Sequence, residues 1–347
     1  MPTTVKAYAV LETNGSIEPV TIERRDVGAH DVQIDIQYCG ICHSDMNFVK
    51  MPLPESPLVL GHEIVGEVTA VGEAVTKHAV GDRVGIGCMV NSCRECANCL
   101  QGQEQYCLNG HTLVFSSPDR DGTMTQGGYS EMIVANEDFV VKVPAALDPA
   151  AAAPLLCAGA TVFAPLKDWK VGPGSNVAII GLGGLGHLAV KFAKAKGAVV
   201  TALSRSDRKR DDALRLGADA YFATAEQDTF KTLANSFDLV INTVSGSIDV
   251  DAYLGLLALG GTLVNAGIDS EPVTMNVYNV IRNRRSYTGT HFGGITETQE
   301  MLDFAAEHGV TAEIEMISAN QINEAYQRIL DADVRYRFVL DNATLTS

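Results

Sequence analysis

The fold is decided by the stretch Val177-Ala178-Ile179-Ile180-Gly181-Leu182-Gly183-Gly184-Leu185-Gly186. Its first four residues are typical of a buried strand. The next six fit the pattern G-x-G-x-x-G and open a helix that we expect to end near residue 196. Glycines at this spacing let backbone N–H groups approach a pyrophosphate at a helix N-terminus. The pattern alone is weak evidence for a binding site. Between a strand and a helix, however, it predicts a turn that binds a dinucleotide rather than a tight turn that binds no ligand.

Strands and helices alternate on both sides of this turn. We expect strands at 177–180, 199–203, 239–244 and 262–266, with a helix at 208–216 between two of them. Such alternation predicts an α/β fold with a doubly wound parallel sheet.

The end of the second strand indicates which dinucleotide binds. An NAD site usually carries an acidic residue there, whereas this strand is followed by Ser204-Arg205-Ser206 and then Asp207-Arg208-Lys209-Arg210. Hydroxyl, guanidinium and ammonium groups suit a 2′-phosphate. A solvated basic helix start is the alternative, but positive charge at a helix N-terminus opposes the helix dipole. We therefore predict NADP(H) rather than NAD.

The region before residue 148 has a different character. Extended stretches at 5–9, 20–23, 32–39, 64–71, 84–86 and 129–134 are separated by glycine-rich breaks, which is typical of an irregular β-barrel or sandwich. The pattern shortens again after residue 285. We expect one domain from 1–148 and 285–347, discontinuous in sequence, and a nucleotide-binding domain from 149–284.

Three separated residues have the chemistry of a catalytic zinc site. Cys42 follows the predicted strand at 32–39, His62 lies twenty residues later, and Cys157 stands alone. A catalytic zinc takes three protein ligands and leaves one position open. A lone Cys or His is more often a core residue than a ligand, and we assign Cys39 and Cys88 to the core. The combination with a dinucleotide site favours the metal.

A second cysteine cluster has stronger spacing. Cys93, Cys96, Cys99 and Cys107 form C-x2-C-x2-C-x7-C in a polar stretch. Four thiolates suit a closed, structural zinc site. An iron–sulfur cluster is the main alternative, although the wide last gap and the missing proline after Cys107 weigh against it.

Composition limits the partners. The chain has 347 residues and a formal net charge of −16, which argues against a nucleic-acid surface. No apolar run approaches the ~20 residues that span a bilayer, and the N-terminus lacks a secretory signal. We expect a cytoplasmic protein without nucleic-acid or membrane partners.

Together these motifs resemble the zinc-containing medium-chain alcohol dehydrogenases, in the cinnamyl alcohol dehydrogenase-like branch. The resemblance covers nearly the whole chain. It rests on the motifs at 39–45, 61–63, 93–107, 126–129, 156–159, 181–187 and 335–338. It implies a GroES-like catalytic domain, a Rossmann domain, two Zn²⁺ per subunit and reversible NADP(H)-dependent interconversion of aldehydes and primary alcohols. It also implies a homodimer, with a tetramer as the alternative.

The resemblance implies roles for individual residues. Ser44 would bond the substrate oxygen, Asp45 would orient His62, and Glu63 would replace the water ligand of the zinc transiently. The cofactor contacts that it implies are His43, Thr161, the turn at 181–186, Ser204, Arg205, Ser206, Lys209, Thr243 and Arg337.

This chain departs from its relatives at the end of the proton relay. Many relatives carry a His five residues after the zinc cysteine, where this chain has Asn47, which does not titrate near neutral pH. Thr112 and His291 stand where plant relatives have bulky aromatic residues. Two alternatives to aldehyde reduction therefore stay open: reduction of an activated C=N or C=C bond, and a non-catalytic NADP-binding zinc protein.

Overall fold

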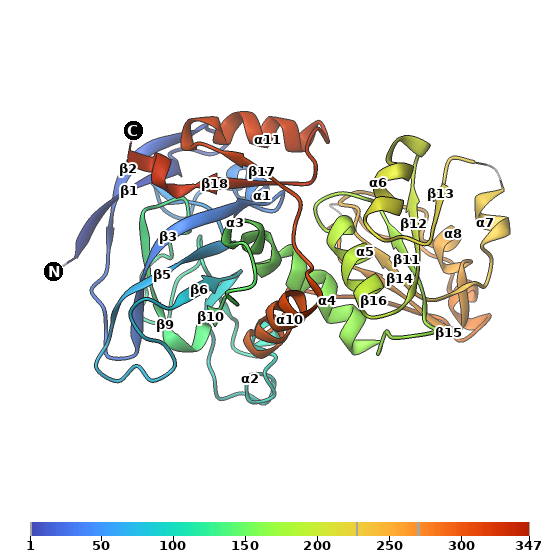
Figure 1. The fold of residues 1–347 in the computed structure, drawn as a ribbon, viewed down its shortest axis with the longest axis horizontal. Helices are drawn as coiled ribbons and strands as arrows, with labels where there is room; N and C mark the ends of the chain where they lie inside the picture. Colours follow the sequence, from blue (N-terminus) through green and yellow to red (C-terminus); the bar gives the residue numbers. More distant parts are fainter. Residues whose placement is uncertain (1, 227, 269–270, 347) are drawn as a thin grey trace. The chain divides into compact units, whose positions relative to one another are not determined.

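The computed structural model describes residues 2–226, 228–268 and 271–346 (Figure 1). The chain forms two compact units, one from 1–157 with 293–347 and the other from 158–292. The predicted division was after residue 148 and before residue 285. In the structure, residues 149–157 belong with the first unit and 285–292 with the second.

The second unit is built on a six-stranded parallel sheet, which confirms the predicted doubly wound fold. Its strand order is β13-β12-β11-β14-β15-β16. The strands are β11 (Asn176–Ile180), β12 (Val199–Ser204), β13 (Ala220–Ala223), β14 (Phe237–Asn242), β15 (Leu257–Asn265) and β16 (Ser286–Gly289). Val177 lies beside Val200 on one side and Leu239 on the other. The order reverses next to β11, so the glycine turn after this strand lies at the switch point of the sheet.

Helices and short 3₁₀ segments connect these strands. They are α4 (Ala158–Asp168), α5 (Gly186–Ala195), η4 (Asp207–Lys209), α6 (Arg210–Arg215), α7 (Thr229–Thr232), α8 (Val250–Leu254) and α9 (Val277–Ile281). The helix α5 contacts β11 and β12, and α8 contacts β15. Leu203, Val240 and Leu263, all buried, belong to the core between the sheet and its helices.

The first unit contains the irregular β-structure predicted for the GroES-like domain. Its largest sheet has the order β10-β6-β5-β3-β18-β17, and β9 also pairs with β3. A second sheet has the order β2-β1-β4, and β7 pairs with β8. The strands are β1 (Thr3–Val10), β2 (Ile17–Arg24), β3 (Asp31–Ile41), β4 (Leu58–Val59), β5 (Ile64–Val71), β6 (Arg83–Ile86), β7 (Met89–Asn91), β8 (Thr112–Leu113), β9 (Met132–Asn136), β10 (Val141–Lys142), β17 (Ile314–Ile317) and β18 (Arg337–Asp341).

The first unit also contains α-helices and short 3₁₀ segments. They are α1 (Asp45–Lys50), α2 (Ala97–Leu100), η1 (Glu104–Tyr106), η2 (Glu137–Phe139), α3 (Pro149–Ala152), η3 (Ala153–Leu156), α10 (Ile295–His308), η5 (Ala319–Gln321), α11 (Ile322–Leu330) and η6 (Asn342–Thr346). The helical segment η3 contacts β3, β5 and β6. A Cβ added at Gly87 would lie 2.7 Å from the Leu156 carbonyl oxygen, which shows how closely η3 approaches the sheet.

The C-terminal tail completes the main sheet of the first unit. β18 pairs antiparallel with β3, with Phe338 opposite Ile41 and Leu340 opposite Cys39. Both β3 and β18 are mostly buried, so the tail is part of the core rather than an appendage.

Among the described residues, no single helix is long and apolar enough to cross a membrane. One bent pair, Pro149–Leu156 and Ala158–Asp168, meets that test only when its two members are taken together, by length and composition alone.

Candidate active site

Three segments of the first unit bring together the predicted ligands of the catalytic zinc. Cys42 follows β3, His62 lies just before β5, and Cys157 follows η3. One donor atom each from Cys42, His62, Glu63 and Cys157 lies within 4.8 Å of the others. His62 Nε2 is 3.3 Å from Cys157 Sγ. Two sulfurs and one imidazole nitrogen form a donor set that fits zinc.

Ser44 borders the same cluster. Its hydroxyl lies 3.1 Å from Cys42 Sγ and 3.3 Å from His62 Nε2. The side chain is half-buried, whereas His43 and Asn47 on either side of it are exposed. Ser44 is therefore the hydroxyl placed beside the donor atoms.

Hydrogen bonds orient the imidazole of His62. Its Nδ1 lies 2.7 Å from Asp45 Oδ1, and Asp45 is fully buried. The Cys42 backbone N–H donates to Asp45 Oδ2 at 3.1 Å. Asp45 therefore links two of the predicted ligands, as a carboxylate beside a metal-bound histidine usually does.

The pKa values of the two thiols in the cluster are shifted in opposite directions. The hydrogen bond from Cys157 lowers the pKa of Cys42 well below its usual value. The same bond, and a second contact with Cys88, raise the pKa of Cys157 well above it. A cation held between the two sulfurs would favour the thiolate form of both.

Glu63 and Arg337 form a buried ion pair beside the cluster. Arg337 Nη2 donates to Glu63 Oε1, and both side chains are at most 5% exposed. Burial raises the pKa of Glu63 to about 8, against the opposing charge of Arg337. Among the described residues, Glu63 Oε2 has no hydrogen-bond partner. The resemblance implies that Arg337 contacts the cofactor; in the structure its guanidinium is buried against Glu63.

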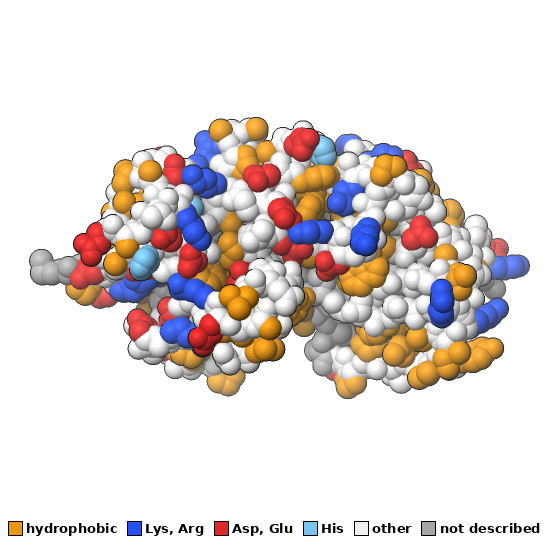
Figure 2. All heavy atoms as spheres, turned by 90° about the horizontal axis from the view of Figure 1, so that it is seen from below, with side chains coloured by type: hydrophobic (Ala, Val, Ile, Leu, Met, Phe, Trp, Pro, Cys, Tyr) orange, Lys and Arg blue, Asp and Glu red, His pale blue; other side chains and the backbone are white. Residues whose placement is uncertain are grey.

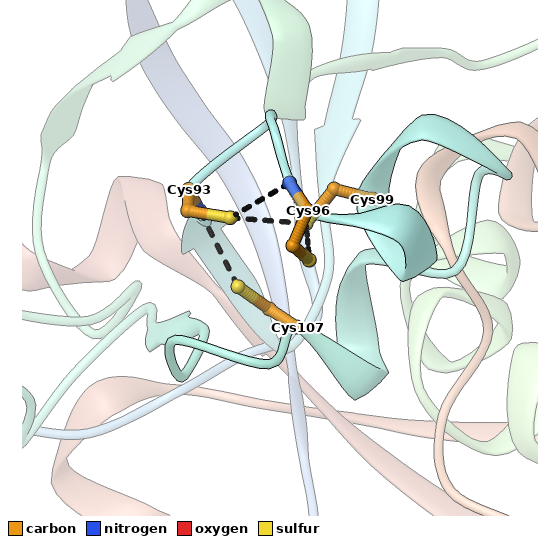
Figure 3. Close-up of side chains that lie close together, drawn as sticks. All are labelled: Cys93, Cys96, Cys99 and Cys107. Atoms are coloured by element: carbon orange, nitrogen blue, oxygen red, sulfur yellow. Dashed lines mark hydrogen bonds between the residues drawn. The ribbon is translucent and has the colours of Figure 1, made fainter.

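The four remaining predicted ligands form a second cluster around α2. The side chains of Cys93, Cys96, Cys99 and Cys107 point toward one another (Figure 3), and their sulfurs lie within 4.8 Å of one another. Backbone N–H groups donate to three of these sulfurs at 3.3–3.4 Å. The N–H of Glu95, and next that of Cys96, lower the pKa of Cys93 to about 6, whereas burial raises that of Cys99 to about 12. A central cation would let all four sulfurs be thiolates, so the cluster fits a closed zinc site.

The predicted dinucleotide turn lies between β11 and α5 in the second unit. Gly181 has φ +87°, and a Cβ there would lie 2.8 Å from Val244 Cγ2. A Cβ at Gly186 would overlap the Gly181 carbonyl oxygen. The Thr243 hydroxyl donates to the Ile180 carbonyl at 2.8 Å and so joins the turn to the end of β14.

The predicted 2′-phosphate residues follow β12. Ser204 is half-buried, and Arg205 and Ser206 are exposed. Lys209 Nζ donates to the Leu182 carbonyl at 2.7 Å, so its ammonium lies beside the glycine turn. Another predicted cofactor contact, Thr161, lies in α4 and is 8% exposed.

Sequence reasoning missed two residues of the catalytic cluster. The Tyr129 hydroxyl donates to Asp45 Oδ2 at 2.9 Å, and the Tyr326 hydroxyl lies 3.1 Å from that of Tyr129. These pairs are 84 and 197 residues apart in sequence, and no motif spacing relates them.

Comparison with known proteins identifies the two domains. The family "Alcohol dehydrogenase GroES-like domain" matches residues 28–145, and the family "Zinc-binding dehydrogenase" matches residues 184–307. The fold and the two cysteine clusters thus define a zinc-binding dehydrogenase with a GroES-like and a Rossmann domain.

Full-length relatives place the chain within this class. It is 56% identical over 347 residues to NADP-dependent alcohol dehydrogenase C 1 of Mycolicibacterium smegmatis, with 99% of each chain covered. It is 47% identical over 348 residues to aldehyde reductase YahK of Escherichia coli, again with 99% of each covered. The solved structure of a cinnamyl alcohol dehydrogenase from Sorghum bicolor matches with a TM-score of 0.95 and 43% identity, covering 98% of each chain. The chain belongs to the zinc-containing medium-chain alcohol dehydrogenases, in the cinnamyl alcohol dehydrogenase-like branch.

Proposed function

We propose that this protein is an NADP(H)-dependent zinc alcohol dehydrogenase that interconverts aldehydes and primary alcohols. The observation that carries the proposal is the convergence of Cys42, His62 and Cys157, with the Ser44 hydroxyl beside them. Three ligands leave one coordination position for a substrate oxygen. Relatives named as NADP-dependent alcohol dehydrogenase and aldehyde reductase, both similar over their full length, support the same reaction.

Each residue of the cluster has its own role in the proposed reaction. When bound, zinc supplies a Lewis acid for the substrate oxygen and NADP(H) supplies or accepts the hydride. Ser44 hydrogen-bonds that oxygen and holds the proton that it gains or loses. Asp45 fixes His62. Asn47 does not titrate near neutral pH, so the proton passes from Ser44 to water rather than to a side chain at that position.

Glu63 has the role of an exchange ligand. Its carboxylate borders the cluster, and its Oε2 atom has no partner among the described residues. We infer that Glu63 would serve as an additional ligand to a bound zinc when no substrate is present, while Arg337 restrains its other oxygen.

Each chain holds a second, structural zinc on Cys93, Cys96, Cys99 and Cys107 in this proposal. All four ligand positions there are protein sulfurs, so the site offers no position for a substrate. The N–H groups that donate to the sulfurs belong to the same loop, so the metal fixes the path of this loop.

The cofactor is NADP(H). Ser204, Arg205, Ser206 and Lys209 would hold the 2′-phosphate, while the glycine turn holds the pyrophosphate. The exposure of Arg205 and the position of Lys209 beside Leu182 support this assignment. We also assign cofactor contacts to Thr161 and Thr243, which belong to the second unit, and to His43, which belongs to the first.

We further infer a homodimer that forms through the second unit, with a tetramer as the alternative. β16 is an edge strand of the six-stranded sheet, and α9 has no buried residue. Apolar side chains of this unit are exposed on the face that Figure 2 shows. Apolar residues of α9 are exposed as well. The exposed fractions are 74% for Leu259, 61% for Val277, 63% for Tyr278 and 67% for Ile281. A second copy of this edge would pair with β16 and cover these residues.

We expect the protein to act in the cytoplasm. All eight cysteines are free thiols, and seven of them lie in or beside the two clusters. Metal-ligating thiols persist best in a reducing compartment.

The proposed reaction is tested with zinc-replete protein, NADPH and a panel of aliphatic and aromatic aldehydes. We expect NADPH oxidation that a zinc chelator abolishes. Cys157→Ser should abolish turnover while NADPH affinity, measured by fluorescence titration, stays near that of the wild type. Tight NADPH binding with no aldehyde turnover would contradict the proposal. It would favour reduction of C=N or C=C bonds, which needs no alcohol proton relay, and iminium and enone substrates would then be tested.

A further inference from the structure

Behind His62 lies a series of three buried side chains, Asp45, Tyr129 and Tyr326. His62 Nδ1 is 2.7 Å from Asp45 Oδ1, and the Tyr129 hydroxyl is 2.9 Å from Asp45 Oδ2. The Tyr326 hydroxyl is 3.1 Å from the Tyr129 hydroxyl. Asp45 and Tyr129 are fully buried, and Tyr326 is 7% exposed. Four polar groups from four separate segments thus form one hydrogen-bonded series inside the first unit.

The number of protons that each group carries determines which atom donates and which accepts in every hydrogen bond of this series. An ionised carboxylate only accepts, so Tyr129 donates its one proton to Asp45. The oxygen of Tyr129 can then only accept, which makes Tyr326 the donor to it. At the other end Asp45 accepts from His62 Nδ1–H, so in the neutral imidazole that binds a metal the lone pair is on Nε2. Nε2 is the atom that lies 3.3 Å from both Ser44 Oγ and Cys157 Sγ.

The environment keeps both phenols protonated. Burial, and next the charge of Asp45, raise the pKa of Tyr129 and Tyr326 well above the usual value. Asp45 Oδ2 accepts from the Cys42 N–H as well as from Tyr129. Without the Tyr129 hydroxyl, that oxygen would keep one donor among the described residues.

Packing alone does not require these hydroxyls. Tyr129 lies between β8 and β9, and its N–H donates to the Leu60 carbonyl at 3.0 Å. Tyr326 lies on the buried face of α11 with Ile322 and Ala325. A phenylalanine ring would fill either position with nearly the same volume. Two hydroxyls that follow one another behind a buried carboxylate therefore point to a polar role.

We propose that Tyr129 and Tyr326 are positioning residues of the metal centre. They hold Asp45 as a fixed acceptor, which holds His62 in the Nδ1–H tautomer and slows the loss of zinc from Cys42, His62 and Cys157. The inference rests on the proposed zinc site. It adds a second and a third residue, after Asp45, to the support of His62, reaching as far as α11.

The rate of zinc release from the holoenzyme to a coloured chelating indicator tests this role. Tyr129→Phe should release one zinc per chain about tenfold faster than the wild type, as loss of support behind a ligand does. Tyr326→Phe should have a smaller effect in the same direction. The double variant should match Tyr129→Phe, because Tyr326 reaches Asp45 through the Tyr129 hydroxyl. The zinc of the four-cysteine cluster is an internal reference and should leave at the wild-type rate.

Tyr8→Phe is the matched control. Tyr8 lies buried in β1 of the same unit, and the variant removes a phenol hydroxyl without touching Asp45. It should leave both release rates unchanged. NMR spectra of ¹⁵N-histidine-labelled holoenzyme provide a second measurement, in which the Nδ1–H proton of His62 should exchange with water faster in Tyr129→Phe than in the wild type, but not in Tyr8→Phe.

The outcomes separate this inference from the proposed function. Two zinc ions in the wild type with unchanged release in both Tyr129→Phe and Tyr326→Phe would overturn the positioning role alone. Equal acceleration of both zinc ions would also overturn it, because a general loss of stability would then explain the result. One zinc per wild-type chain, held by the four cysteines, would overturn both proposals. If Tyr129→Phe does not fold, Tyr326→Phe alone decides between faster release and the wild-type rate.

Discussion

At the scale of single residues, the interior of the first unit leaves no room for a side chain at Gly40. A Cβ there would overlap Glu63 Oε2 and lie 3.0 Å from Glu63 Cβ. The Gly40 N–H also donates to the Glu63 carbonyl at 2.9 Å. Glycine is therefore required because β3 passes directly beneath the ion pair of Glu63 and Arg337.

Gly40→Ala should displace Glu63 and weaken its contact with Arg337. Breaking a buried ion pair costs about 3–5 kcal/mol. We expect a clearly lower free energy of unfolding in urea, together with altered turnover. Gly172→Ala is the control, since a Cβ there meets nothing within 4 Å. Equal stability of the two variants would show that Glu63 is free to move aside.

The individual ligands could be predicted from sequence, and so could Asp45 behind His62, but the more distant supporting residues could not. Cys42, Cys93 and Cys96 lie in short motifs whose spacing carries chemistry. Tyr129 and Tyr326 reach the site through the packing of distant segments, and in a single sequence they look like any buried aromatic residue. Arg337 was predicted as a cofactor contact, but its pairing with Glu63 also depends on the packing of distant segments.

At the scale of elements, the helix α2 and the loop around it have little apolar core of their own. Leu100 in α2 is 74% exposed, and Cys99 is the one buried residue of this helix. Bound zinc rather than apolar packing would hold such a loop.

Cys99→Ser should remove the zinc of this loop. Zinc content should fall from two ions to one per chain, and thermal stability should fall because structural zinc contributes folding energy. Cys39→Ala is the control: Cys39 is fully buried in β3 and belongs to neither cluster, so this variant should keep both ions. An unchanged melting temperature in Cys99→Ser would refute the structural role.

The residues that follow the end of β12 should determine the preference for NADPH over NADH. Arg205→Asp places a negative charge where we expect the 2′-phosphate, so the ratio of kcat/KM for NADPH to that for NADH should fall at least about tenfold. Arg208→Asp makes the same change of charge at an exposed neighbour and should shift the ratio much less. Similar ratios for Arg205→Asp and the wild type would show that the phosphate lies elsewhere.

Element boundaries were predicted less well than element types. The expected helix at 208–216 begins as η4 and becomes α6 only at Arg210. The expected strand at 129–134 begins at Met132, because residues 127–129 instead bond to residues 59–61. Tertiary contacts decided both cases, and such contacts leave no local pattern.

At the scale of the whole molecule, acid should weaken the first unit through its ion pairs. Burial would raise the pKa of Asp31, but hydrogen bonds from Arg25 and the Gly28 N–H, together with the Arg25 charge, lower it below its usual 3.8. A depressed pKa in the folded state adds stability that is fully present above about pH 4. That stability is lost as pH falls through the folded value.

Asp31→Asn should therefore lower the melting temperature by about 2 °C at pH 7. The difference from the wild type should shrink below pH 4, where the wild-type carboxylate becomes protonated. Calorimetry from pH 3 to pH 7 measures the melting-temperature difference at pH 7 and its decrease below pH 4. Asp26→Asn, at an exposed neighbouring carboxylate, is the control. A difference that stays constant with pH would mean that packing, not charge, explains the effect.

The pairing of β18 with β3 also sets an order of events during synthesis on the ribosome. All six strands of the Rossmann sheet have been made once residue 289 has been added. At that moment β3 still has an unpaired edge, because β18 begins only at Arg337. The Rossmann unit can fold first, while Cys42 and His62 stay on an unfinished sheet. The nascent chain can therefore complete its dinucleotide turn before it can complete the sheet that carries its metal ligands.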